Sequence, residues 1–174
     1  MMLKRRSFTL IELMVVVAVI GILAAMLVPG VSNLIEKARI ARAESELKNF
    51  QTACAAVYAD VGYYPRDVGP NTDPGLVSIA RVPASLRSNW NGPYLRRWPL
   101  NPWGGRYDYQ GWNYAPFNFD GTAGNENLIS IYDFPQPTIQ SKIDSELDDG
   151  SATSGTIRYG GSVLHYYIGE GIRW

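Results

Sequence analysis

The chain has 174 residues, of which 46% are hydrophobic, and its 16 lysines and arginines balance 16 aspartates and glutamates. A net charge of zero gives no electrostatic basis for nucleic acid as the main partner, and this length holds one membrane segment and one compact domain of about 110 to 120 residues. The single cysteine, Cys54, excludes an internal disulfide and is expected to be a small buried residue on a helix.

A basic head, Lys4 to Arg6, is followed by an apolar run from Phe8 to Val28. At 1.5 Å per residue, these roughly 21 residues form a helix about 31 Å long, which matches a hydrocarbon core about 30 Å thick. We therefore predict a membrane-spanning helix over residues 8–29. The positive charges before it hold that end in the cytoplasm, so everything after Pro29 is expected on the outer side of the membrane.

Glu12 is the one acidic residue of this apolar run. A carboxylate inside a bilayer costs roughly 2.5 to 3.5 kcal/mol at the membrane centre and less toward the edge, so it needs a partner. A secretory signal would have a shorter apolar core, and a plain anchor gives no reason for Glu12. A helix that first spans the bilayer and later packs against other protein helices explains both the length of the apolar run and the presence of Glu12.

A cut between Ser7 and Phe8 would supply the positive partner. It would remove the basic head and create an α-amino group on Phe8, with an unperturbed pKa of about 7.7 to 8.0. In a staggered stack of identical helices, this amine can approach Glu12 of the next copy. Two unit charges about 4 Å apart attract by about 4 kcal/mol at an effective dielectric of 20, and desolvation offsets part of this. We therefore predict subunit assembly through Phe8 and Glu12.

The segment from Ser7 to Glu12, which reads SFTLIE before the apolar run, resembles the prepilin processing site of type IV pilins and type II secretion pseudopilins. The resemblance implies that residues 1–7 are a leader removed by a prepilin peptidase and that Phe8 is then N-methylated. It also implies that Glu12 is the family's conserved glutamate. Ser7 stands where that family usually has glycine.

Helical spacing continues past Pro29, and Gly62 and Pro65 follow as helix-ending residues. We predict an amphipathic helix over residues 30–61. Pro29 and Gly30 interrupt the helix at a cost of about 3 kcal/mol and predict a kink. The kink is either a static bend or, as the resemblance implies, a turn that unwinds when subunits pack. The apolar positions expected on one side are Leu34, Ile35, Ala38, Leu47, Phe50, Cys54, Val57 and Tyr58.

Over residues 62–174, Gly, Pro, Asn, Trp and Tyr separate short runs, which is typical of turns and short strands. The pattern predicts four strands and a short helix over residues 137–146. The strands are expected over residues 106–110, 128–134, 156–159 and 162–168. Neighbouring strands favour an antiparallel sheet packed on the exported half of the long helix. The predicted class is α+β, and the resemblance identifies it as the pilin fold.

Two loop motifs extend the resemblance, to the major pseudopilins of type II secretion, over about the first 110 residues. They are similar to the stretches W-x-GPYL and DPWG-x-x-Y, and Asn101 stands where that family normally has Asp. The matching residues are Trp90, Gly92, Pro93 and Tyr94 in the first motif and Pro102, Trp103, Gly104 and Tyr107 in the second.

An aromatic cluster in the domain has two open interpretations. It either pins long loops to the sheet or forms a face that binds sugar or protein. Its members are Trp90, Trp98, Trp103, Trp112, Tyr94, Tyr107, Tyr109 and Tyr114.

An acidic cluster also has two interpretations, a helix end with its turn or a calcium site. The major pseudopilin family has a calcium site near its C-terminus, but the spacing here matches neither that loop nor an EF-hand. The cluster consists of Asp144, Glu146, Asp148 and Asp149 beside Gly150. Calcium is the one candidate cofactor, and its ligands are not assigned.

The sequence predicts no catalytic residue. His165 is the only histidine, lies in a tyrosine-rich strand pattern and is expected to be a satisfied or surface residue. Neither metal-ligand spacing nor a phosphate-binding loop occurs.

We therefore predict a structural filament subunit, the major pseudopilin of a type II secretion system. The alternatives are a type IV pilus pilin, used for adhesion, motility or DNA uptake, and a membrane-tethered binding module. The implied partners are copies of the chain in a helical homopolymer, the prepilin peptidase, an inner-membrane assembly platform, minor pseudopilins, and the lipid bilayer before assembly. The expected location is the bacterial inner membrane, crossed once, with the C-terminal domain in the periplasm and the filament there or at the cell surface.

Overall fold

The structure is a computed structural model that describes residues 8–112, 118–119 and 124–174, without the side chains of residues 27–30 and of Trp112. The predicted leader, which includes Ser7, lies outside the described residues, and so does Tyr114 of the aromatic cluster. Helix α1 (Leu10–Val61) continues across Pro29 and Gly30, whose side chains are not described, so the kink predicted there stays a prediction.

The chain divides into two compact units, Met1–Ala38 and Arg39–Trp174. Helix α1 (Leu10–Val61) lies in the first unit up to Ala38 and continues into the second. Between Phe8 and Met26 its large apolar side chains are exposed on every side, by amounts that range from 47% at Val16 to 75% at Phe8. This part of α1 is long and apolar enough to cross a membrane. A helix that is apolar all round must be covered by lipid or by protein.

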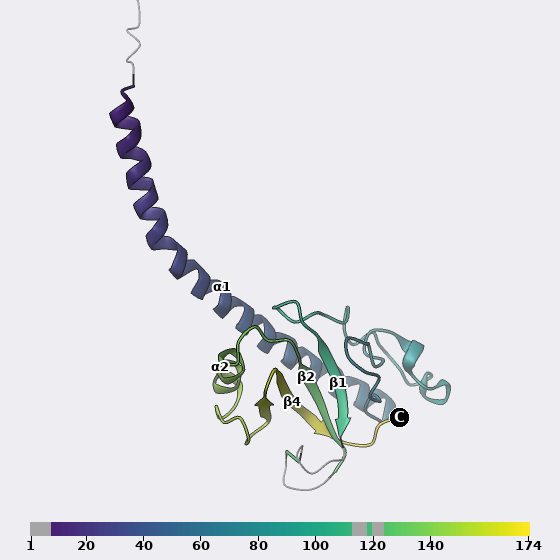
Figure 1. The fold of residues 1–174 in the computed structure, drawn as a ribbon. Coiled ribbons are helices and arrows are strands. Elements are labelled where there is room, and N and C mark those ends of the chain that lie inside the picture. The colour runs from purple at the N-terminus through teal and green to yellow at the C-terminus, as the bar shows by residue number, and fades with distance from the viewer. Residues whose placement is uncertain (1–7, 113–117, 120–123) are drawn as a thin grey trace, which may run out of the picture. The chain divides into compact units, whose positions relative to one another are not determined.

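The second unit, residues 39–174, contains a four-stranded antiparallel sheet (Figure 1). Its strands are β1 (Tyr107–Trp112), β2 (Glu126–Ile131), β3 (Ile157–Gly160) and β4 (Val163–Glu170), in the order β1-β2-β4-β3. Helix α2 (Thr138–Leu147) lies between β2 and β3 in the sequence. The predicted α+β fold is confirmed, because every predicted strand and the short helix are present, with ends that differ by at most three residues.

The connection from α1 to β1 has little regular structure beyond two short 3-10 helices, η1 (Ile79–Arg81) and η2 (Ala84–Leu86). Asp73 organises its first turn, because its carboxylate accepts hydrogen bonds from four successive backbone amides, those of residues 75–78, at 2.8 to 3.1 Å. The Asp73 carboxylate thus provides acceptors for backbone amides that are not paired within a helix or a sheet.

The core lies between one face of the sheet, the second part of α1, and α2 (Figure 1). In β4 burial alternates, with Leu164, Tyr166 and Ile168 inside, as expected for a strand with one face on the core. The buried apolar residues of α1 are Ile40, Ala43, Leu47, Phe50, Ala53, Cys54, Val57 and Val61.

Part of the predicted inward side of the long helix is wrong. Leu34 and Ile35 are 67% and 49% exposed, because they belong to the first unit and not to the globular core. Ala38 is exposed for the same reason. Tyr58 is 42% exposed and places its ring 4.7 Å from that of Tyr64, at the margin of the core.

The end of α1 is joined to the last residues of the chain. Tyr64 forms a parallel bridge with Arg173. Its backbone amide donates to the Ile172 carbonyl at 2.9 Å, and its carbonyl accepts from the Trp174 amide at 3.1 Å. The indole of Trp174 lies against Gly75, whose φ of +117° is a conformation that favours glycine.

The other face of the sheet carries a buried polar row. Asp108 of β1 is the register partner of Ser130 in β2, and Ser130 is the partner of His165 in β4. The Ser130 hydroxyl donates to Gln110 Oε1 and lies 2.8 Å from His165 Nδ1. His165 is therefore a satisfied histidine, as predicted. In a nucleophilic triad the carboxylate hydrogen-bonds the histidine, whereas here Ser130 lies between Asp108 and His165, so the row is not such a triad.

Burial shifts both titratable groups of this row toward their neutral forms. It lowers the pKa of His165 to about 4. It also raises the pKa of Asp108 to about 6, with a smaller contribution from the charge of Asp67. Both shifts follow from the cost of placing a charge in a poorly solvated environment.

We predict that Asp108→Asn stabilises the protein at pH 8 and has little effect at pH 4. The folded pKa of about 6 exceeds the ordinary value of 3.8, so the wild type loses stability as pH rises between these values, and asparagine removes this penalty. Thermal unfolding of both proteins at the two pH values tests this, with an expected gain of a few degrees, about 3 °C, at pH 8. The titration of His165 affects both proteins, so its contribution cancels from the difference between their melting temperatures. An equal gain at both pH values would contradict the pKa assignment.

Candidate functional site

The start of α1 holds a reciprocal cap made by Thr9 and Glu12. The Thr9 hydroxyl oxygen accepts from the Glu12 amide at 3.3 Å. Glu12 Oε2 accepts from the Thr9 amide at 2.9 Å and from the Thr9 hydroxyl at 2.8 Å. This is the capping box that T-x-x-E favours at a helix N-terminus. Sequence reasoning considered only a partner from another chain and missed this role, which the T-x-x-E spacing could have revealed.

Glu12 keeps capacity for a further partner. Its Oε1 takes part in none of these three contacts. The surrounding side chains are apolar and exposed, with Leu10, Ile11 and Leu13 between 59% and 72% accessible. Phe8, whose amine is the predicted partner in a neighbouring copy, lies at the same end of the helix. The contact between copies stays a prediction.

The first loop motif forms a bend that packs on α1. The Trp90 indole donates to the Gly75 carbonyl at 2.9 Å, and a Cβ at position 92 would overlap the Trp90 ring, so Gly92 is required there. The Tyr94 hydroxyl donates to Asp60 Oδ2 at 2.8 Å and accepts from the Asn91 amide at 2.9 Å. Pro93 continues the bend, and Tyr94 thereby joins this loop to α1.

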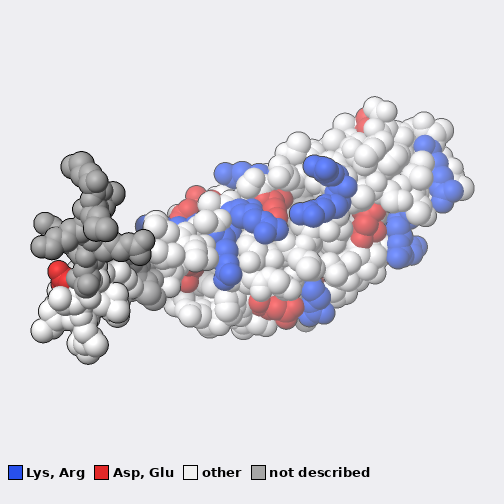
Figure 2. Space-filling view, turned by 90° about the horizontal axis from the view of Figure 1, so that it is seen from above, with Lys and Arg blue, Asp and Glu red and all other residues white. Residues whose placement is uncertain are grey.

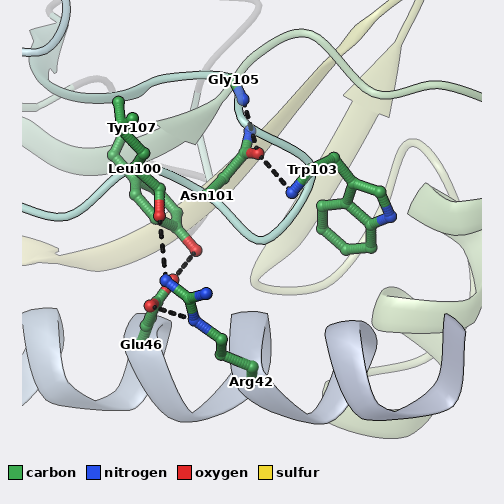
Figure 3. A network of polar contacts seen from close by, with 7 residues as sticks. All are labelled: Arg42, Glu46, Leu100, Asn101, Trp103, Gly105 and Tyr107. Carbon is green, nitrogen blue, oxygen red and sulfur yellow. Dashed lines mark hydrogen bonds and ion pairs between the residues drawn. The ribbon is translucent and has the colours of Figure 1, made fainter. Parts of the chain in front are cut away.

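The second loop motif is organised by Asn101, which is 3% exposed. Its Oδ1 accepts from the backbone amides of Trp103 and Gly105, both at 2.9 Å (Figure 3). Its Nδ2 donates to the Tyr132 carbonyl at 2.7 Å. The turn continues through Pro102 and through Gly104, whose φ is +87°. Asn101 therefore uses both ends of its amide, a role that aspartate cannot reproduce.

A second network connects this motif to the helix (Figure 3). The Tyr107 hydroxyl donates to Glu46 Oε2 at 2.7 Å. Arg42 Nε lies 2.9 Å from Glu46 Oε1, and its terminal nitrogen donates to the Leu100 carbonyl at 3.3 Å. Burial and the adjacent Glu46 raise the pKa of Tyr107 well above its usual value, which keeps the hydroxyl protonated as the donor.

The described members of the aromatic cluster pack on the core. Tyr107 and Tyr109 are fully buried, and Phe50 lies 5.0 Å from both the Trp98 and the Tyr107 rings. Trp90, Tyr94, Trp98 and Trp103 are partly buried against the same core. This arrangement supports the loop-pinning interpretation.

A groove lies beside these loops, with a volume of about 630 Å³. It is lined by Glu46, Asn49, Phe50, Leu95, Arg96, Arg97 and Pro99.

On the molecular face seen in Figure 2, Lys and Arg side chains lie beside Asp and Glu side chains, so neither sign of charge dominates.

The acidic cluster is only partly brought together. Asp144, Asp148 and Asp149 have carboxylate oxygens within 4.8 Å of one another at the end of α2, whereas Glu146 is not part of this group. Burial raises the pKa of Glu44 on α1 to about 7, with a smaller contribution from the neighbouring Glu146.

We predict that Asn101→Asp destabilises the protein, because a carboxylate oxygen would face the Tyr132 carbonyl in place of a donor. Leaving a buried group without its partner costs about 1 to 3 kcal/mol. Urea unfolding followed by tryptophan fluorescence measures the change, with Asn91→Asp at the exposed position of the first motif as the matched control. Equal stability of the two variants would show that the donation to Tyr132 contributes nothing.

Two family models match the chain. The prokaryotic N-terminal methylation motif covers residues 2–28. The model described as PilW, C-terminal, covers residues 34–119. Together they span the start of α1, both loop motifs and β1.

Several proteins named type II secretion system core protein G are similar to this chain. That of Pseudomonas aeruginosa is 35% identical over 131 residues, which cover 74% of this chain and 83% of the relative. That of Escherichia coli K12 is 32% identical over 136 residues, which cover 73% of this chain and 90% of the relative. That of Aeromonas hydrophila is 36% identical over 139 residues, which cover 74% of this chain and 94% of the relative. No solved structure matches the chain significantly. From the methylation motif and this similarity along most of both chains, we conclude that the chain belongs to the core protein G family, the major pseudopilins of type II secretion systems.

Proposed function

We propose that this chain is a structural subunit of a filament, the major pseudopilin of a type II secretion system. A prepilin peptidase cuts between Ser7 and Phe8, the new terminus on Phe8 is methylated, and the helix moves from the bilayer into a polymer of identical copies. The observation that carries the proposal is the exposed apolar surface of α1 between Phe8 and Met26, with Glu12 as its one carboxylate.

The apolar surface supports assembly because it needs cover in every state of the protein. Large side chains are exposed around the whole circumference of α1 between Leu10 and Met26, and among the described residues none of this apolar segment is buried within the chain. Lipid covers this surface while the helix spans the membrane. Other copies of the same helix cover it after extraction, since apolar surface is stabilised by roughly 25 cal/mol per Å² removed from water.

Glu12 supports a defined register between copies. Its Oε2 is held by Thr9, while Oε1 is outside that cap. The cap orients the carboxylate before assembly, and the Phe8 amine of a neighbouring copy approaches it from outside. Such a pair contributes more to register than to stability, because desolvation offsets its Coulomb attraction. Unwinding near Pro29 and Gly30 during packing is part of the same proposal.

The remaining partners follow from this role. Before assembly the chain crosses the inner membrane once, with its C-terminal domain in the periplasm. An inner-membrane assembly platform extracts it, and minor pseudopilins join the same filament. We propose no catalytic activity for the chain, and the two loop motifs serve to hold the domain together.

We predict that the mature protein lacks residues 1–7 and carries a methyl group on the Phe8 amine. Mass spectrometry of the N-terminal peptide from cells with and without the prepilin peptidase measures both changes. In peptidase-deficient cells, the full chain with its basic head is expected. An N-terminal peptide that still starts at Met1 in normal cells would overturn the processing step.

We further predict that Glu12→Gln abolishes filament assembly while the membrane-inserted subunit accumulates normally. Glutamine can form the same cap with Thr9 and removes only the charge. Thr9→Val is the matched variant, because it removes the side-chain part of the cap and keeps the carboxylate. It is expected to reduce assembly less than Glu12→Gln does.

Electron microscopy of periplasmic and sheared surface filaments, with cross-linking in cells, measures assembly of the two variants. Filaments of Glu12→Gln at wild-type abundance would contradict the charge pairing. Wild-type fibres that occur only outside the cell, with no effect of the chain on secretion, would favour a pilus role over secretion.

A further inference from the structure

The first loop motif contains the only asparagine of the sequence that is followed by glycine, at Asn91 and Gly92. In such a pair, the backbone nitrogen of the glycine can attack the side-chain carbonyl carbon of the asparagine. Glycine favours this reaction because it has no Cβ to hinder the approach and its backbone adopts many conformations. Asparagine is for this reason a chemically labile residue, and the motif contains a candidate site of covalent change.

The two groups that would react have no hydrogen bond to any described residue. Asn91 is exposed, and of its polar groups only the backbone amide is engaged, as a donor to the Tyr94 hydroxyl at 2.9 Å. The backbone amide of Gly92 donates to no acceptor in the described part of the chain. Neither the side-chain amide of Asn91 nor the nitrogen of Gly92 therefore has to give up a protein partner before the reaction.

The packing of Trp90 requires glycine at position 92. A Cβ at this position would overlap the Trp90 ring, so a larger residue does not fit without a shift of the indole. The indole is itself held in place, because its nitrogen donates to the Gly75 carbonyl at 2.9 Å. The residue that allows Trp90 to pack is therefore also the residue that makes Asn91 most reactive.

We propose that Asn91 is a site of spontaneous deamidation, and that its isoaspartyl product loosens the attachment of the first loop motif to the domain. The Gly92 nitrogen bonds to Asn91 Cγ, the bond from Cγ to Nδ2 breaks, and ammonia leaves with the proton of the Gly92 amide. Water then opens the resulting succinimide ring at either carbonyl, which gives aspartate or isoaspartate. In isoaspartate the backbone runs through Cγ and is longer by one carbon. This inference goes beyond the proposed filament function.

The additional backbone carbon falls between two fixed points of the loop. Before it, the Trp90 indole is held by its hydrogen bond and by packing on Gly92. After it, the backbone amides of Tyr94 and Leu95 donate to the Leu76 carbonyl at 2.8 and 3.0 Å. The amide that donates to the Tyr94 hydroxyl belongs to the altered residue itself. A longer backbone between these anchors cannot preserve the geometry of all of them, so the loop is held less tightly.

Peptide mapping of the full-length protein, aged in detergent micelles at pH 8, tests the reaction. Trypsin releases residues 88–96, which also contain Asn89, an asparagine followed by tryptophan. We expect the mass of this peptide to rise by the difference between an amide and a carboxyl group, with fragment spectra that place the change at Asn91 alone. Ageing at pH 6 is expected to be slower, because the attacking nitrogen must lose its proton. An unchanged Asn91 at pH 8, or an equal change at Asn89, would overturn the proposal.

Thermal unfolding tests the effect of the product on the loop. Aged wild type with isoaspartate at position 91 is expected to melt a few degrees, about 3 °C, below fresh protein. Asn91→Gln is the matched control, because glutamine keeps the amide but must form a larger ring and so reacts more slowly. Fresh Asn91→Asp carries the new charge on an unaltered backbone and is expected to melt as fresh wild type does. An equal loss in aged Asn91→Gln, or no loss in converted wild type, would contradict the loosening of the loop.

Discussion

The apolar surface at the start of α1 cannot remain in water, and this constraint governs the rest of the molecule. Side chains from Phe8 to Met26 are exposed around the whole helix, and no other described part of the chain covers them. This segment therefore needs a cover of lipid or of protein. The globular unit has its own core between α1, α2 and the sheet, so it can fold without the apolar segment being covered.

Loop attachment, more than regular structure, shapes the globular unit. A long connection separates α1 from β1, and it is fixed by a few side chains that reach from the loop to the helix or the sheet. Tyr94 contacts Asp60, Tyr107 contacts Glu46, and Asn101 contacts Tyr132. Each of these hydrogen bonds has a partner distant in sequence, so the motif residues join parts of the domain that lie far apart along the chain.

The sequence predicted much of the fold, because long helices and short strands have local signatures. The apolar run, the helix-ending Gly62 and the short runs between turn residues each depend on neighbouring residues. What it could not reveal depends on tertiary pairing. The double role of Asn101 arises only when its loop meets the segment after β2, and the row of Asp108, Ser130 and His165 only when distant strands pair. The Thr9 and Glu12 cap was visible in the spacing but was overlooked in favour of a contact between chains.

The bridge between Tyr64 and Arg173 has a consequence for the order of events during biogenesis. At Tyr64, just after α1, the backbone amide donates to the Ile172 carbonyl and the carbonyl accepts from the Trp174 amide. The bridge therefore cannot form until residue 174 has been synthesised, and pairing of residues so distant in sequence is slow because the entropy of closing a long loop opposes it. Until then the backbone that follows α1 lacks these partners, so this end of the domain stays open.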